Sequence, residues 1–131
     1  MKHVEIRHSD WSGARDALEA SLKLVPGRFE ARRSLGNVYS QLGQLKQAED
    51  QFDAAVFLEP ANGAARLDFA RVLFADKNYA AAAAQLEEAT RIEPQNKEAW
   101  SLLKQAYDGQ GKRELAAKAA ARAAALGASK R

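Results

Sequence analysis

The chain contains no cysteine, which excludes a disulfide framework, a thiolate zinc site and a cysteine nucleophile. Its two histidines, His3 and His8, are five residues apart, whereas histidines that bind a metal from one helix are four apart and need a third ligand. The glycines lie at expected helix junctions rather than in a phosphate-binding loop. The sequence therefore predicts no catalytic residue, no metal site and no cofactor.

Long apolar runs are also missing. No segment approaches the roughly 20 apolar residues that span a membrane, and Met1 to Asp10 is polar and mixed in charge, unlike a secretory signal. A length of 131 residues with 47% hydrophobic residues suits one compact domain. The net charge of +3 is only weak evidence for an anionic partner.

Proline is scarce, but its positions are regular. The three prolines, Pro26, Pro60 and Pro94, are spaced 34 residues apart, and a fixed period of this length indicates a repeated supersecondary unit. Other positions repeat with the same period: Leu24, Leu58, Ile92 and Leu126; Ala14, Ala48, Ala82 and Ala116; Leu18, Phe52, Leu86 and Ala120; Leu35, Phe69 and Leu103; Tyr39, Leu73 and Tyr107.

Within each period the apolar residues have helical spacing. Ala48, Phe52 and Ala55 lie at i, i+4 and i+7, on one face of a helix. Alanine, a strong helix former, is the most abundant residue. Glycines between the apolar stretches suit helix C-caps, and Asn62 and Asn96 suit N-caps. We expect helices near 10–24, 29–42, 45–58, 63–75, 79–92, 97–108 and 112–126, and no strand.

These residues follow a known pattern. Leu35, Gly36 and Tyr39, then Ala48 and Phe52, then a proline at 60 match the order Leu-Gly-x2-Tyr, Ala-x3-Phe, Pro. The chain beyond Ser9 thus resembles the tetratricopeptide repeat family. The resemblance implies an all-α, right-handed solenoid of about three and a half stacked helix-turn-helix repeats. Its expected division is a partial repeat over 1–28, repeats over 29–62 and 63–96, a terminal repeat over 97–126 and a tail over 127–131, all in one domain.

Small residues on the first helix of each repeat are expected to allow close helix packing. Gly36 should face Ala48, and Ala70 should face Ala82, because small side chains let two helices approach closely. Phe52 should then reach into the following repeat, which buries a core that no single repeat could bury alone.

The first repeat lacks its first helix. Trp11, Ala14 and Leu18 therefore form an apolar edge without its usual cover, and such patches typically mark an interface or a cut chain. Two interpretations remain open: the chain is a piece of a longer array, or a second copy or partner helix covers this edge as part of an oligomer.

The C-terminal stretch is basic and suits a terminal repeat. It lacks interleaved aromatic residues for base stacking, and its apolar side is mostly alanine, which is thin for membrane insertion. We therefore expect neither nucleic-acid binding nor membrane insertion, and interpret the charge as a solvated face. The basic residues are Lys112, Arg113, Lys118, Arg122, Lys130 and Arg131.

The resemblance also implies where a partner binds. In this family the first helices line a concave channel that holds an extended peptide or a partner helix. Arg33, Asn37 and Arg71 would hold a carboxylate or backbone carbonyls, and Leu67 and Phe74 would supply an apolar seat. The alternative is that these are ordinary solvated residues. The full candidate set is Arg33, Asn37, Gln41, Leu67, Asp68, Arg71, Phe74, Ser101 and Gln105.

One branch of the family clamps the C-terminal carboxylate of heat-shock chaperones. Arg33 and Asn37 match the basic residue and the asparagine of the first clamp helix. Asp68 replaces a second asparagine and would repel a carboxylate, while Glu98 and Leu102 replace basic residues. We therefore reject chaperone-tail binding.

The leading hypothesis is a non-catalytic scaffold that binds a peptide or helix of another protein in its concave channel. The alternative is a self-assembling module, or a fragment of a larger array, that acts through the edge formed by Trp11, Ala14 and Leu18. The high alanine content is typical of GC-rich bacterial genomes. We expect a cytoplasmic location, or a periplasmic one if the chain is part of an exported protein.

Overall fold

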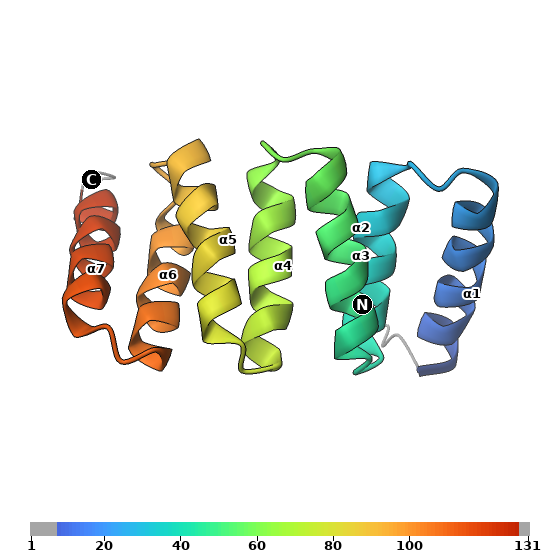
Figure 1. The fold of residues 1–131 in the computed structure, drawn as a ribbon, viewed down its shortest axis with the longest axis horizontal. Coiled ribbons are helices and arrows are strands. Elements are labelled where there is room, and N and C mark those ends of the chain that lie inside the picture. The colour runs from blue at the N-terminus through green and yellow to red at the C-terminus, as the bar shows by residue number, and fades with distance from the viewer. Residues whose placement is uncertain (1–7, 129–131) are drawn as a thin grey trace, which may run out of the picture. The chain divides into compact units, whose positions relative to one another are not determined.

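A computed structural model describes residues 8–128 and, from Asp10 onward, their side chains. These residues form seven α-helices and no strand (Figure 1), which confirms the expected all-α fold. The helices are α1 (His8–Leu24), α2 (Phe29–Gln41), α3 (Leu45–Leu58), α4 (Gly63–Ala75), α5 (Tyr79–Ile92), α6 (Lys97–Gly109) and α7 (Arg113–Ala128).

The helix bounds agree with the expected ones to within two residues. One difference concerns the C-terminus, where a tail was expected from Gly127. Helix α7 continues through Gly127 to Ala128, so the first part of that tail is helical. Residues 129–131, like 1–7, lie outside the described part of the chain.

The chain divides into two compact units, one ending at Glu59 and one beginning at Pro60. Arg66 Nε donates a hydrogen bond to the Pro60 carbonyl at 2.9 Å, and Asn62 Oδ1 accepts one from Ala65 N at 3.1 Å. The loop of residues 60–62 is therefore bonded to α4 and belongs with the second unit.

In the first unit, α2 packs against both α1 and α3. Gly36 on α2 closely approaches the ring of Phe52 on α3: a Cβ added at Gly36 would lie 2.8–2.9 Å from three ring atoms. Gly36 thus makes room for the Phe52 ring, while the expected contact of Gly36 with Ala48 stays a prediction. Phe52 is fully buried, and part of its packing is within its own repeat.

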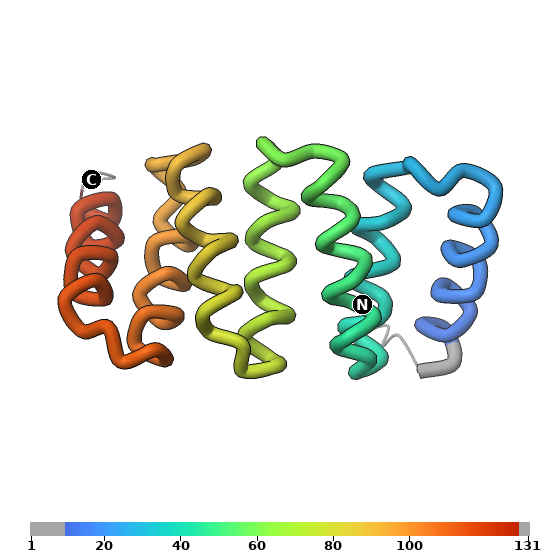
Figure 2. Tube along the Cα trace, viewed as in Figure 1, coloured from blue at the N-terminus to red at the C-terminus, as the bar shows by residue number. Residues whose placement is uncertain are grey.

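In the second unit, neighbouring helices pack in order, α4 on α5, α5 on α6 and α6 on α7. The turns that join α4 to α5 and α6 to α7 lie at the same end of this unit (Figure 2). Much of the core of this unit consists of residues that recur with the 34-residue period. It includes Ala70, Ala82, Leu86, Ala89, Ala99, Leu103 and Ala116.

The tight turns depend on left-handed backbone. Gly43 and Gly111 have φ values of 75° and 74°, and Lys77 has a φ of 59° at the equivalent position. Glycine adopts this conformation without penalty, whereas a Cβ crowds the following carbonyl. The expected glycine C-caps are confirmed, and Lys77 is the strained member of the set.

Asparagine caps begin three helices. The side chains of Asn62, Asn78 and Asn96 each accept a hydrogen bond from the backbone N–H three residues on, at 3.1–3.2 Å. The caps at Asn62 and Asn96 confirm the prediction, and Asn78 adds one at α5. At the corresponding starts of α2 and α3, Arg28 and Gln44 make no such bond.

Candidate functional site

The first unit presents a polar face on α2. Asn37 and Gln41 are exposed, and Arg33 is half-buried one turn before Asn37. Residues four apart lie on the same side of a helix, so these three donor-bearing side chains form one row, as the sequence predicted. We call them the α2 face. Amide and guanidinium groups here can donate hydrogen bonds to the carbonyls of an extended peptide.

In the second unit, Arg71 is already engaged by two carboxylates. Its Nη1 donates to Asp68 Oδ1 at 3.1 Å, an i,i+3 pair within α4, and its Nη2 donates to Glu98 on α6. From the sequence, we expect Arg71 to hold a carboxylate or backbone carbonyls of a partner. The guanidinium instead ties α4 to α6 inside its own unit, so a ligand carboxylate would have to displace Glu98.

The two residues predicted as an apolar seat, Leu67 and Phe74, both pack within the second unit. Leu67 is 6% exposed and belongs to the core. Phe74 is half-buried, and its ring packs edge-to-face on Tyr79 with 5.9 Å between centroids. Leu67 therefore contributes to the core, while Phe74 keeps part of its surface accessible, and its role as an apolar seat stays a prediction. They were chosen by their position on α4, and the sequence alone did not show that this helix is covered on more than one side.

Helix α6 supplies the remaining predicted residues. Ser101 is half-buried and Gln105 is exposed. Beside them, Lys104 Nζ pairs with Asp108 at 2.9 Å across one turn. We call Arg71, Ser101 and Gln105, together with the charged Asp68, Glu98, Lys104 and Asp108, the α4/α6 face. It is a mixed polar surface in which each charge lies near an opposite one.

The N-terminal edge is only partly covered. Trp11, Ala14 and Leu18 on α1 are all half-buried, while Leu22 on the same helix is buried. Leu24 at the end of α1 is 84% exposed. The expected uncovered edge is thus half-covered by packing within the first unit, and the larger apolar exposure lies at the C-terminal end of α1.

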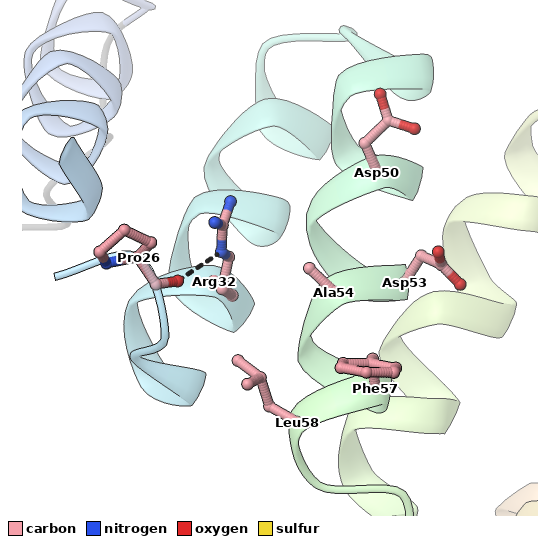
Figure 3. Close-up of a pocket in the computed structure, with 7 residues that line it drawn as sticks. All are labelled: Pro26, Arg32, Asp50, Asp53, Ala54, Phe57 and Leu58. Carbon is pink, nitrogen blue, oxygen red and sulfur yellow. Dashed lines mark hydrogen bonds between the residues drawn. The ribbon is translucent and has the colours of Figure 1, made fainter.

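A pocket on α3 was not predicted from the sequence. It has a volume of about 420 Å³, and Phe57 on its wall is 83% exposed. Asp50 and Asp53 project from the preceding turns of α3 (Figure 3). Phe57 falls outside the repeat's core columns, which is the signal that could have drawn attention to it. The other lining residues are Pro26, Arg32, Ala54 and Leu58.

Comparison with known protein families agrees with this architecture. The family model for the tetratricopeptide repeat matches residues 3–66 and again residues 34–97. The chain belongs to the tetratricopeptide repeat family. No curated protein sequence shows significant similarity to it.

Several solved tetratricopeptide repeat structures have the same fold. One MamA structure has a TM-score of 0.85 at 22% identity and covers 95% of this chain and 76% of its own. MamA from Desulfovibrio magneticus RS-1 has a TM-score of 0.82 at 26% identity, over 89% of this chain and 66% of its own. The first repeat domain of Spaghetti (RPAP3), bound to the HSP90 peptide SRMEEVD, has a TM-score of 0.70 at 23% identity, over 75% and 78%.

The column of Arg32, Arg66 and Trp100, which are spaced 34 residues apart, has a recurring role. Trp100 Nε1 donates to the Pro94 carbonyl at 2.8 Å. Arg32 and Arg66 occupy the same column, and their Nε atoms donate to the carbonyls of Pro26 and Pro60 at 3.1 and 2.9 Å. Each arginine also bonds a glutamine on the second helix of its repeat, Gln51 or Gln85, at 2.9 Å. This role was not predicted from the sequence, although the 34-residue spacing of Arg32, Arg66 and Trp100 is visible there.

The tyrosine column joins neighbouring repeats. Tyr107 Oη donates to Glu87 Oε2 at 2.6 Å, and Tyr39 Oη donates to Glu19 Oε2. Burial, followed by the hydrogen bond to the nearby carboxylate, raises the pKa of Tyr39 and of Tyr107 to about 12. Both hydroxyls therefore stay protonated at neutral pH and serve as donors.

Among the residues that the structure describes, no group of three or more His, Cys, Asp or Glu residues is placed to hold a metal ion. Within the same range, no helix has both the length and the apolar character needed to cross a membrane. His3 lies outside the described residues.

Proposed function

We propose that this chain is a non-catalytic interaction scaffold that binds a peptide or helix of another protein through its first helices. The α2 face supplies Arg33, Asn37 and Gln41 as donors, and the α4/α6 face supplies Ser101 and Gln105. The observation that supports this most strongly is the α2 face: three polar side chains in one row on a helix whose opposite side is buried in the core. Backbone carbonyls of an extended segment are the acceptors that such a row suits.

The peptide is not expected to be a carboxylate-terminated chaperone tail. Spaghetti (RPAP3) is related in fold and was solved with an HSP90 peptide. In this chain, however, Arg71 pairs with both Asp68 and Glu98. The three groups together carry a net negative charge where a terminal carboxylate would approach. We propose instead a neutral or mildly basic segment held mainly through its backbone.

Selection of binders from a random peptide library, followed by calorimetry on the tightest one, tests this function. We expect Arg33→Ala combined with Asn37→Ala to weaken binding roughly tenfold or more, because the double variant loses about two hydrogen bonds to the peptide. The matched control is Glu88→Ala with Arg91→Ala, which removes an exposed ion pair on α5. If the control and the α2 variant bind equally well, the α2 face is not the site.

Self-assembly through α1 remains an alternative, favoured by the half-buried row of Trp11, Ala14 and Leu18 and by the exposed Leu24. Leu18→Glu should then disperse an oligomer in size-exclusion chromatography and leave peptide binding intact. A parent chain that runs as a monomer at all concentrations contradicts this alternative.

A cytoplasmic location stays a prediction, which fractionation of cells that express the protein would test.

A further inference from the structure

The exposed face of α3 carries an acidic and apolar strip. Asp50, Asp53 and Phe57 lie at i, i+3 and i+7, and therefore on one side of the helix. All three are exposed (Figure 3). In the part of the chain that the structure describes, neither aspartate takes part in an ion pair. We call these three residues the α3 strip.

The α3 strip forms part of the wall of the pocket on α3, together with apolar residues. Phe57 is 83% exposed, and Ala54, Leu58 and Pro26 line the pocket beside it. Arg32 also lines it, but its Nε and Nη1 are engaged by Pro26 O and Gln51 Oε1. An exposed aromatic ring next to an apolar hollow, with carboxylates along one side, suits a segment that offers one apolar side chain and two cations.

Helix α7 offers that combination. Leu115, Lys118 and Arg122 also lie at i, i+3 and i+7, and we call them the α7 strip. Leu115 is 41% exposed, and both cations are exposed. The Arg122 guanidinium lies over the Trp100 ring, 5.2 Å from its centroid. Stacking leaves the N–H edge of a guanidinium directed outward, where it can bond a carboxylate.

We propose that the α7 strip of a second copy of this chain packs antiparallel on the α3 strip. In this register Leu115 lies against Phe57 at the pocket, Lys118 meets Asp53 and Arg122 meets Asp50. The first and last residues of each strip are seven positions apart, about 10.5 Å along a helix axis, so the three pairs form together. A parallel register would place Leu115 against Asp50 and Arg122 against Phe57, which loses the apolar pair and one ion pair.

Charge complementarity identifies a second copy as the occupant. The α3 strip carries two carboxylates and the α7 strip two cations, and every copy presents one strip of each kind. Two such contacts can close a dimer, or they can continue from copy to copy. A single helix pair buries less than the roughly 1,200 Å² of a stable specific complex, so the association is weak, concentration-dependent and weakened by salt.

This contact is separate from the proposed peptide site. It uses no residue of the α2 face, of the α4/α6 face or of the row formed by Trp11, Ala14 and Leu18. Peptide binding and this self-association can therefore fail independently, and each has its own variants.

Sedimentation velocity at low salt, up to about 1 mM protein, tests the proposal with paired charge reversals. Asp53→Lys and Lys118→Asp should each lower the association constant roughly tenfold, because an attractive pair becomes a repulsive one. An equimolar mixture of the two variants should regain association, because the lysine introduced at position 53 meets the aspartate introduced at position 118. Glu88→Lys, an equal charge change outside both strips, should behave like the parent.

Circular dichroism establishes that each variant keeps its helical content. If Asp53→Lys does not fold, Leu115→Gln replaces it and should also weaken association roughly tenfold, because the polar amide removes the apolar contact with Phe57. A parent chain that stays monomeric over the whole range overturns the proposal and leaves the pocket to a foreign basic segment. Variants that associate like the parent, or a mixture that stays dispersed, overturn it equally.

Discussion

Arg32 Nε donates a hydrogen bond to the carbonyl of Pro26, six residues earlier, at 3.1 Å (Figure 3). The bond fixes the loop before α2 to the first turn of that helix. Arg32 Nη1 also reaches Gln51 on α3 at 2.9 Å, so one planar guanidinium joins the loop and both helices of the repeat. The chain repeats this arrangement at Arg66, with Pro60 and Gln85.

Replacing Arg66 tests the contribution of this arrangement to stability. Arg66→Ala should lower the free energy of unfolding by about 1–2 kcal/mol, because two partly exposed hydrogen bonds are lost. Arg66→Trp should retain most of the stability, since Trp100 makes the equivalent bond in the next repeat. Urea unfolding followed by circular dichroism measures both. A tryptophan variant no better than the alanine variant would contradict an equivalent role.

Lys77 offers a stabilising substitution. Its φ of 59° is unfavourable for a residue with a Cβ, so Lys77→Gly should raise the free energy of unfolding by about 0.5–1 kcal/mol. The control is Gly43→Ala at the equivalent turn, which should lower it by about 1 kcal/mol. Thermal unfolding of both variants measures the changes. Equal melting temperatures for Lys77→Gly and the parent would show that the turn is not strained.

Gly36 and Phe52 should respond as a pair. Phe52→Ala should cost roughly 3–5 kcal/mol, as for a buried aromatic ring. Gly36→Ala should cost about 1 kcal/mol net, because the crowding of Phe52 outweighs the gain in helix propensity. Adding Phe52→Leu to Gly36→Ala should recover part of that loss in a double-mutant cycle of urea unfolding. If the effects of Gly36→Ala and Phe52→Leu on the free energy of unfolding are additive, the packing of the Phe52 ring does not depend on the absence of a Cβ at Gly36.

The two tyrosine contacts predict loss of stability in alkali. Folding raises the pKa of Tyr39 and Tyr107 from 10.0 to about 12, so the native state holds these protons more tightly than the unfolded state does. The resulting stabilisation is complete below pH 10 and is lost as the pH rises through 12. Urea unfolding at a series of pH values measures this loss.

A single carboxylate can be tested in the same titration. Glu19→Gln should lower the pKa of Tyr39, as seen in the ultraviolet absorbance of tyrosinate, because a neutral amide repels the phenolate less. Tyr107 keeps its partner Glu87 and serves as the internal reference. If the titration is unchanged by Glu19→Gln, burial alone would account for the raised pKa.

Regular features of the fold were predictable because each depends on local chemistry. Helix ends, turn glycines and the asparagine caps follow from residues within a few positions, and a fixed period repeats them. The packing between columns was harder to predict. Gly36 lies under Phe52, the next repeat holds Ala70 and Leu86, and the last holds Lys104 and Ala120. From one repeat to the next, the residue in the Gly36 column becomes larger and the residue in the Phe52 column becomes smaller. The contact between Gly36 and the Phe52 ring explains this relation, and it is a tertiary contact that local spacing does not reveal.

The candidate site was less predictable than the fold. Arg33, Asn37 and Gln41 were placed correctly on one face because helical spacing decides which residues share a side. The bond between Arg71 and Glu98 joins residues 27 positions apart, and the burial of Leu67 depends on tertiary packing. Neither is visible in local spacing. The Phe57 pocket was missed for the opposite reason: it lies on the face that the repeat pattern leaves undefined.

The three asparagine caps all begin helices of the second unit, α4, α5 and α6, while α2 and α3 begin without one. Each cap lowers the cost of starting a helix by about 1 kcal/mol, and repeat proteins can nucleate folding wherever local order is strongest. Folding would then begin in the second unit, which the ribosome makes after the first, and spread toward α1.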